Sequence, residues 1–283
     1  MANLTVEFFS NCLLRPVQFK MYIPNDMNER WQPEQKRKGL PMHTVVLLHG
    51  YTGAAANWIP ERLAVKYNLA VVMPSGENGF WVDGISTGHR YGTFLTEELT
   101  GYVRKTFGLC RSAEDTSIMG MSMGGYGALR AALDRPDVFG RAVALSPALV
   151  IHSRAHMKPG DPDPHGNYEY YRECFGDLET VEQSRNNPEV LVDGLLAAGR
   201  SLPEIFLAIG TKDFLLQRSR DLHAFLDAKS VKHHYLEFEG GHDMEFWDEC
   251  VRRIVPMLFG DEPGVSSDQQ CSGAARQRAD KNG

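Results

Sequence analysis

Short runs of hydrophobic residues recur along the chain, and each is bounded by glycine, proline or polar residues. Unbroken runs of this length, rich in branched side chains, are typical of strands buried on both faces of a largely parallel sheet. Two earlier segments alternate hydrophobic and polar residues and predict an antiparallel hairpin at the sheet edge. The hairpin strands are residues 5–9 and 17–23, and the later strands are residues 44–48, 69–73, 116–119, 142–145, 205–209 and 235–238.

Segments with helical periodicity lie between these strands, at residues 58–67, 94–106, 124–133, 214–228 and 245–258. The alternation favours an open α/β sheet with helices on both faces. Residues 152–199 interrupt it with a stretch rich in proline, glycine, tyrosine and charge, which predicts a cap-like insertion after the sixth strand. We therefore expect one α/β domain over residues 1–260 and a disordered polar tail over residues 261–283.

Composition narrows the class of partner. The 283 residues are 42% hydrophobic, which supports a globular core, and the formal net charge of -6 gives no electrostatic footprint for nucleic acid or an anionic membrane. The sequence shows no secretory signal and no run near the roughly 18 apolar residues of a membrane-spanning helix. Five scattered cysteines without CxxC spacing indicate free thiols. We expect a cytoplasmic protein with a small-molecule substrate, and a homo-oligomer is compatible with the sequence.

Residues 117–127, SIMGMSMGGYG, place Ser122 among several glycines. The spacing misses the third glycine of a dinucleotide-binding fingerprint, and no lysine is present to form a P-loop. Residues 120–124 do match G-x-S-x-G, between a predicted strand and a predicted helix. Small residues two positions before and after Ser122 permit the sharp turn that exposes a nucleophile, although a Gly-Ser turn before a tightly packed helix is the alternative.

A nucleophilic serine requires a base and a carboxylate, which follow the serine in the order acid then histidine in this type of fold. Asp213 directly follows the predicted strand at residues 205–209, where it is either the acid or a helix N-cap. His242 follows the last predicted strand within EGGHD, where two glycines permit a sharp turn toward the sheet edge. Ser122, Asp213 and His242 are therefore the candidate catalytic residues.

The backbone also supplies candidate groups. The N–H of Met123 lies at the predicted helix N-terminus, where an oxyanion would form. The loop LHGYTG offers the Tyr51 amide as a second donor, and His49 in that loop is predicted to support it by hydrogen bonding. Metal-binding residue types also occur together in the predicted insertion, at His152, His156 and His165 with nearby aspartates. They lack HExxH spacing, so the sequence predicts no metal site there.

The chain resembles the esterase D family of α/β-hydrolases, and within it the tributyrin esterase-like carboxylesterases. The matching segments are VVLLHGYTG, LAVVMPSGENGFWVDG, IMGMSMGGYGAL, AIGTKDFL and GGHDMEFW, in the family's order up to about residue 260. The resemblance implies a cofactor-free serine hydrolase with Ser122, Asp213 and His242 as its triad. It also implies an oxyanion hole formed by Tyr51 and Met123, and a position for Trp81 near the acyl pocket, with ordinary loop packing of this tryptophan as the alternative.

The same broad family contains S-formylglutathione hydrolases, feruloyl and acetyl xylan esterases, and mycolyltransferases. The formylglutathione enzymes usually carry a cysteine in the loop that here is HGYTGAAAN, and this chain has none there. The main hypothesis is therefore a carboxylesterase that hydrolyses short-chain acyl esters through an acyl-enzyme. Acyl transfer to an alcohol, and a binding module that has lost its chemistry, are the competing hypotheses.

Overall fold

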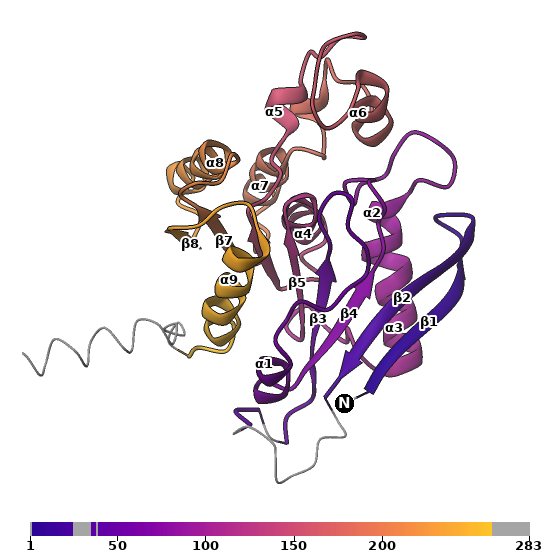
Figure 1. Ribbon diagram of the computed structural model, residues 1–283, viewed down its shortest axis with the longest axis vertical. Helices are drawn as coiled ribbons and strands as arrows, with labels where there is room; N and C mark the ends of the chain where they lie inside the picture. The colour runs from indigo at the N-terminus through magenta and orange to yellow at the C-terminus, as the bar shows by residue number, and fades with distance from the viewer. Residues whose placement is uncertain (1, 25–34, 38, 262–283) are drawn as a thin grey trace, which may run out of the picture.

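The computed structural model describes residues 2–24, 35–37 and 39–261, and within them one sheet has eight strands (Figure 1). The strand order across the sheet is β1-β2-β4-β3-β5-β6-β7-β8. The strands are β1 Ala2–Ser10, β2 Arg15–Ile23, β3 His43–Leu48, β4 Leu69–Pro74, β5 Thr116–Met121, β6 Arg141–Leu145, β7 Glu204–Gly210 and β8 His233–Phe238. Each strand expected from the hydrophobic pattern is present. Of the tail predicted to be disordered, residues 262–283 lie outside the described residues.

The first two strands form the predicted antiparallel hairpin at one edge of the sheet. β1 pairs with β2 from Ala2 opposite Ile23 to Ser10 opposite Arg15, and β2 pairs antiparallel with β4. The other neighbouring strands are parallel. Every residue of β3, β4 and β5 is buried, which accounts for their unbroken hydrophobic runs. Because parallel strands end at one edge, the loops after β3, β5, β7 and β8 converge there.

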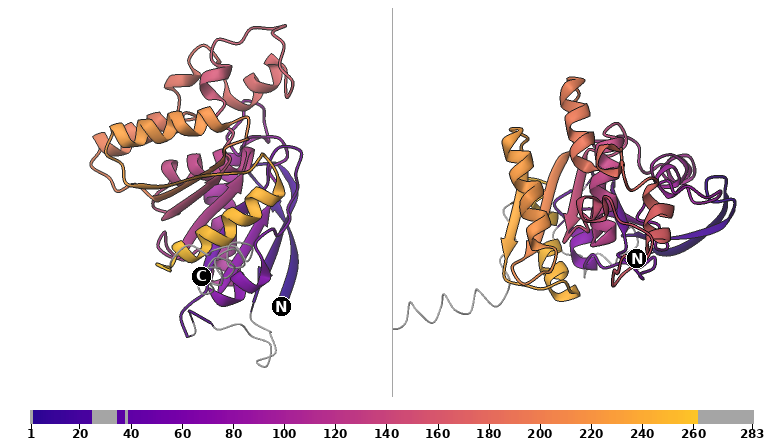
Figure 2. Two further views of the ribbon diagram at one scale, coloured as in Figure 1. Left: turned by 60° about the vertical axis from the view of Figure 1, so that its left-hand side comes forward. Right: turned by 90° about the horizontal axis from the view of Figure 1, so that it is seen from above.

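Helices cover both faces of the sheet (Figure 2). One face contacts α1 (Glu61–Lys66) and α9 (Met244–Met257). The other contacts α2 (Tyr91–Thr93), the π-helix η2 (Phe94–Leu99), α3 (Thr100–Phe107), α4 (Met123–Asp134), α7 (Pro188–Ala197) and α8 (Leu216–Ala228). Successive strand residues enter opposite layers, as Val45 and Val46 do. The predicted α/β architecture is confirmed.

Two helices begin later than the sequence predicts. α1 begins at Glu61 rather than at residue 58, because Pro60 immediately before it has an extended backbone with φ −55° and ψ 127°. α8 begins at Leu216 rather than at residue 214, because its N–H closes a turn onto the Asp213 carbonyl at 3.1 Å. Both differences lie at chain segments that enter the carboxyl edge of the sheet.

The segment predicted as an insertion contains α5 (Ile151–Arg154), α6 (Tyr168–Phe175), the 3-10 helix η3 (Val181–Gln183) and α7. Figure 1 shows α5 and α6 beyond the end of the sheet, whereas α7 lies beside α4. Leu191, Val192 and Leu195 of α7 join the buried core, so this helix is a crossover between β6 and β7. The insertion therefore ends before α7, and the predicted boundary at residue 199 is too late. α7 starts at Pro188, in the first helical position, where proline is tolerated.

In the described part of the chain, no helix combines the length and apolar character needed to cross a membrane. Four of the cysteines, Cys12, Cys110, Cys174 and Cys250, are buried free thiols, as their spacing predicts. The fifth, Cys271, lies outside the described residues.

Candidate active site

Ser122 occupies a sharp turn between β5 and α4. Its backbone has φ 54° and ψ −119°, a conformation that a residue with a side chain rarely adopts. Hydrogen bonds on both sides hold it: the Ser122 N–H donates to the Leu145 carbonyl at 2.8 Å, and the Ser122 carbonyl accepts from the amides of Tyr126 at 3.0 Å and Ala148 at 2.9 Å. Backbone strain maintained in this way is typical of a functional position.

The two glycines of the G-x-S-x-G motif are required by close backbone contacts. A Cβ at Gly120 would lie 2.1 Å from the Gly124 carbonyl oxygen, and a Cβ at Gly124 would lie 2.4 Å from the Leu48 carbonyl oxygen. Both distances are far below van der Waals contact with atoms that cannot rotate away. The motif therefore packs the start of α4 directly against β3 and β5, and leaves Ser122 at the edge of the sheet.

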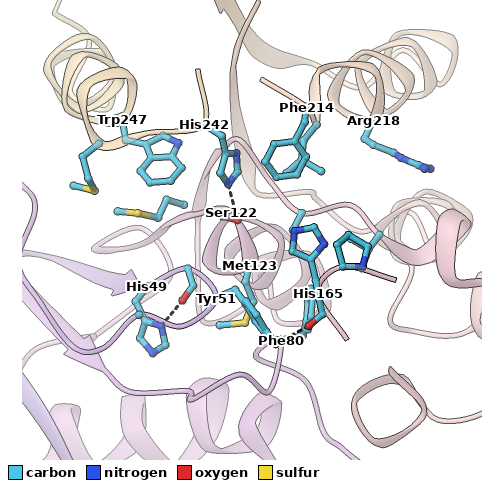
Figure 3. A pocket seen from close by; sticks show the side chains of 18 of the residues that line it. His49, Tyr51, Phe80, Ser122, Met123, His165, Phe214, Arg218, His242 and Trp247 are labelled. Carbon is cyan, nitrogen blue, oxygen red and sulfur yellow. Dashed lines mark hydrogen bonds between the residues drawn. The ribbon is translucent and has the colours of Figure 1, made fainter. Parts of the chain in front are cut away.

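The structure brings Ser122, His242 and Asp213 into one chain of hydrogen bonds. His242 Nε2 lies 3.0 Å from Ser122 Oγ (Figure 3). On the other side of the ring, His242 Nδ1 lies 2.8 Å from Asp213 Oδ2. An ionised carboxylate only accepts hydrogen bonds, so the ring proton is on Nδ1 and Nε2 presents its lone pair to the serine hydroxyl. This is the geometry that a serine hydrolase requires.

Asp213 is buried, and its two oxygens have separate partners. Oδ2 faces His242, while Oδ1 accepts the N–H of Leu215 at 2.8 Å in the turn that leads into α8. Burial opposes ionisation and is the largest single effect on the pKa of Asp213. The hydrogen bonds from His242, the Leu215 amide and the Ser146 hydroxyl together outweigh it, and they hold this pKa below its ordinary value. Asp213 is not the N-cap of α8, since that position is Leu215, but its Oδ1 holds the turn that precedes the helix.

Three residues that contact Asp213 or His242 are not among the candidate site residues of the sequence. Ser146 follows β6 with φ 43°, and its hydroxyl accepts the indole N–H of Trp247 at 3.0 Å while bonding to Asp213. The Trp247 ring also lies edge-on to the His242 ring, with centroids 5.0 Å apart, and Phe214 packs on the imidazole at 4.6 Å. For Ser146, the sequence does contain a signal, which is its position directly after a parallel strand, at the carboxyl end.

His49 fixes the loop after β3. Its Nε2 accepts the N–H of Gly76 at 3.0 Å, so its proton is on Nδ1, which donates to the Gly50 carbonyl at 2.8 Å. The same carbonyl accepts the Gly53 N–H at 3.0 Å. Burial lowers the pKa of His49, which keeps the ring neutral and suited to both contacts. The structure thus gives His49 the supporting position that the sequence predicts.

The anchored Gly50 carbonyl determines the direction of the next amide. Its C=O and the Tyr51 N–H belong to one trans peptide unit, in which the two groups point in opposite directions. A Cβ at Gly50 would lie 3.3 Å from the Ser122 Cβ, so this peptide is adjacent to the serine. On the other side, Met123 is the first residue of α4, where an N–H has no acceptor within the helix.

Trp81 differs from the expectation that it lies near the acyl pocket. It is fully buried with φ 59°, it does not line the cavity above Ser122, and its indole N–H donates to the His49 carbonyl at 3.3 Å. A Cβ at Gly76 or Gly127 would lie within 2.7 Å of its ring, so the indole fills the space beneath the His49 loop. The neighbouring Phe80 is the residue of this segment that lines the cavity.

A cavity of about 820 Å³ opens above Ser122. Its walls come from the loop after β3, the start of α8, the start of α9 and the insertion (Figure 3). Aromatic and other apolar side chains dominate the lining, which includes Trp58, Phe80, Tyr170, Phe214, Met244 and Trp247. A volume of this size is large enough for a drug-sized molecule.

The insertion is anchored to this cavity by polar contacts. The Tyr51 hydroxyl donates to the His165 carbonyl at 2.8 Å. Within the insertion, Asp163 pairs with Arg154 at 2.5 Å and accepts the amides of His165 at 2.9 Å and Gly166 at 3.1 Å. The segment above the serine is therefore internally braced as well as joined to the loop after β3.

His152 and His156, which the sequence offers as possible metal ligands, pair with glutamates. His152 lies between Glu182 at 2.7 Å and Glu189 at 3.1 Å, on opposite ring nitrogens. His156 pairs with Glu179 at 2.8 Å. These contacts link α5 and the following loop to the rest of the insertion and to α7.

Known proteins of similar sequence and structure indicate the family of this chain. Residues 10–258 match the family described as putative esterase. An acetyl esterase of Caldicellulosiruptor saccharolyticus is 36% identical over 256 residues, which cover 89% of this chain and 96% of the relative. The fluorophosphonate-binding serine hydrolase FphF of Staphylococcus aureus has a TM-score of 0.77 at 25% identity, covering 92% of this chain and 99% of its own. An S-formylglutathione hydrolase of the same organism has a TM-score of 0.74 at 25% identity, covering 91% and 98%.

A mostly parallel sheet of this order, in a chain with these relatives, defines a carboxylic ester hydrolase with the α/β-hydrolase fold. Its substrate is thus a small-molecule ester. The chain belongs to the putative esterase family, since the match extends over residues 10–258. The similarity to an S-formylglutathione hydrolase agrees with the resemblance to the esterase D group.

Proposed function

We propose that Ser122 is the nucleophile of a two-step ester hydrolysis, with His242 as general base and Asp213 as the group that orients it. The observation that carries this proposal is the unbroken chain from Ser122 Oγ to His242 Nε2 at 3.0 Å and from Nδ1 to Asp213 at 2.8 Å. Nε2 takes the hydroxyl proton as Oγ attacks the ester carbonyl, then returns it to the leaving alcohol. The same nitrogen next activates water, which attacks the acyl-enzyme and releases the acid.

The amides of Tyr51 and Met123 are the proposed oxyanion hole. Support for Met123 comes from its place at the start of α4, where the N–H is free of the helix and the helix dipole favours negative charge. Support for Tyr51 comes from the anchored Gly50 carbonyl on the same peptide unit. Because both donors are held before substrate binds, little reorganisation accompanies formation of the oxyanion.

We assign short-chain acyl esters as the substrates. The acetyl esterase relative and the resemblance to tributyrin esterase-like enzymes support a small acyl group. The cavity of about 820 Å³ is much larger than an acetyl group needs, and its aromatic lining favours an apolar alcohol portion in the remaining space. Phe80, Tyr170 and Phe214 are the rings that would contact this portion.

The test compares wild type with Ser122→Ala on p-nitrophenyl acetate and butyrate, together with labelling by a fluorophosphonate. Ser122→Ala should reduce kcat by about 10⁴-fold or more and abolish labelling. Ser153→Ala is the matched control, because Ser153 also lines the cavity but its hydroxyl bonds the Val150 carbonyl. A folded wild type that neither turns over these esters nor reacts with the probe contradicts the proposal.

The acyl specificity needs a separate comparison. We expect acetyl and butyryl esters to have higher kcat/KM than feruloyl esters or S-formylglutathione. Addition of competing alcohols measures transfer against hydrolysis, and free acid should remain the main product. A dominant transfer product at low alcohol concentration would instead identify an acyltransferase that uses the same serine.

Two further expectations remain predictions. Assembly into a homo-oligomer can be tested by light scattering on the purified full-length chain. The cytoplasmic location can be tested by fractionation of the source cells.

A further inference from the structure

A second cluster of metal-binding side chains lies away from the candidate active site, where α8 ends and β8 begins. His223 and Asp227 are one helical turn apart on α8, and His233 is the first residue of β8. One donor atom from each of the three residues lies within 4.8 Å of the other two. Because α8 ends one residue after Asp227 and β8 begins at His233, all three residues lie at one corner of the fold.

Two of the donor atoms already lie at coordination distance, and the third is nearby. His223 Nδ1 lies 2.8 Å from His233 Nε2, and an Asp227 oxygen lies 4.0 Å from the same His233 nitrogen. The 3.6 Å contact of Asp227 is with the other ring nitrogen of His223, Nε2, so the carboxylate has to rotate to share an ion with His223 Nδ1 and His233 Nε2. Ligands bonded to zinc at about 2.0–2.2 Å in a tetrahedron are separated by roughly 3.3 Å. The side chain of Asp227 is 63% exposed and that of His223 is 33% exposed, so both can rotate by the small amounts that this spacing requires.

His233 is already oriented as a ligand. Its Nδ1 donates to the Val231 carbonyl at 2.8 Å, which fixes the proton on that nitrogen and leaves the Nε2 lone pair facing the cluster. A second hydrogen bond of this kind, from the other ring nitrogen to a backbone carbonyl, accompanies most metal-bound histidines. The His233 side chain is only 3% exposed, so its position is set by the surrounding structure.

The backbone between the ligands is also fixed. In the turn from α8 to β8, Ser230 N–H donates to the Asp227 carbonyl and Val231 N–H donates to the Leu226 carbonyl, both at 2.9 Å. A nearby cation, Lys229, pairs with Asp193 at 2.6 Å and so does not neutralise Asp227. Two imidazoles and a carboxylate held in this way are the ligand set of a borderline transition-metal ion.

We propose that His223, Asp227 and His233 form a zinc-binding site, completed by water. Binding would replace the hydrogen bond between the two imidazoles with two metal–nitrogen bonds, and the His223 N–H would pass from Nδ1 to Nε2, so the ring stays neutral and presents its Nδ1 lone pair to the ion. The sequence pattern predicts no metal site here, because His233 is brought to His223 and Asp227 only by the fold at the end of α8 and the start of β8.

The site has a structural rather than a chemical role. β8 separates His233 from the loop that carries His242 by on the order of 20 Å, which is too far for the ion to contact substrate. However, α8 follows Asp213 and β8 leads to His242. An ion between the end of α8 and the start of β8 would therefore brace the two elements that carry the acid and the base.

The test uses tag-free, full-length protein freed of metal with a chelator and titrated with zinc chloride by calorimetry. We expect one zinc per chain, and zinc at a hundred times its Kd should raise Tm by roughly 5 °C. His223→Gln should abolish this binding and the Tm shift, and Asp227→Asn should weaken it by about tenfold or more. Both changes are at partly exposed side chains, so the variants should fold.

His152→Gln is the matched control, because it removes a histidine with two carboxylate partners elsewhere on the chain and should leave zinc binding intact. Magnesium should not bind, since this ion prefers oxygen ligands. Ser122→Ala should bind zinc as wild type does, which separates this proposal from that for catalysis. Absence of zinc binding in wild type, or equal binding by His223→Gln, overturns the proposal.

Discussion

The indole N–H of Trp247 donates to the Ser146 hydroxyl at 3.0 Å, and that hydroxyl in turn bonds to Asp213. The arrangement extends the hydrogen-bonded chain of Ser122, His242 and Asp213 by two residues. Because Trp247 uses the hydroxyl oxygen as an acceptor, the Ser146 proton is directed at the carboxylate. Asp213 thus remains ionised in a buried environment.

Ser146→Ala should lower kcat by about tenfold, since a hydrogen bond to a charged group contributes roughly 1.5–3 kcal/mol. Loss of this donor raises the pKa of Asp213, so the acid limb of the pH–kcat profile should move to higher pH. Trp247→Phe keeps the ring beside His242 but removes the N–H, and should give a smaller shift in the same direction. An unchanged acid limb in both variants would show that Ser146 does not act on the carboxylate.

Gly120→Ala should unfold or strongly destabilise the protein. The added methyl would lie 2.1 Å from the Gly124 carbonyl oxygen, and overpacking against backbone costs about 1–3 kcal/mol or more. The comparison is Gly194→Ala in α7, where a Cβ meets no atom within 4 Å. That substitution should stabilise the protein by about 0.5–1 kcal/mol, as expected for glycine inside a helix. Urea unfolding of the two variants measures the difference, and equal effects would contradict the close packing at residue 120.

His49→Ala should lower kcat by about 10²-fold with little change in KM, because the Tyr51 amide loses its fixed direction. A transition-state mimic, such as a trifluoromethyl ketone, should lose affinity by a similar factor. A product carboxylate should lose much less. If both ligands weaken equally, the effect of His49 is on the cavity in general and not on the oxyanion site.

His43 predicts a dependence of stability on pH. It is buried beside Ser117 with Nε2 and Oγ 2.7 Å apart, and burial, then Arg141, Arg37 and Arg111, lower its pKa to about 3. The unfolded chain takes up this proton near pH 6.5, so the free energy of unfolding falls as pH drops from about 6.5 toward 3, by about 1.4 kcal/mol per unit for this group.

Denaturant unfolding at pH 7.5 and 5.0 tests this expectation. At pH 5.0 the contribution of His43 to the loss is about 2 kcal/mol. His43→Gln removes the titrating group and should flatten the pH dependence by this amount, with pH 7.5 as the internal reference. A slope identical to that of wild type would show that His43 is protonated equally in both states.

The strands themselves, and the places of Ser122, Asp213 and His242 after three of them, follow from the sequence, because buried parallel strands and turn glycines leave local signals. The order of the strands across the sheet does not follow from such signals. Local signals of this kind do not predict the position of the Trp81 side chain. The family resemblance implies a pocket residue, but the orientation of Trp81 depends on Gly76 and Gly127, whose missing side chains admit the indole beneath the loop. Ser146 is similar, since its role arises only when three strand ends and α9 meet.

The Tyr51 hydroxyl contacts the carbonyl of His165, not its imidazole. Any amino acid at position 165 can supply that acceptor, so this link between the loop after β3 and the insertion is independent of side-chain identity at position 165. Tyr170 differs, because it lines the cavity and its hydroxyl also holds the insertion by donating to the Asn78 carbonyl at 2.6 Å. Pro164 and His165 line the cavity without such a side-chain link, which makes residues 164 and 165 suitable starting positions for engineering a different ester preference.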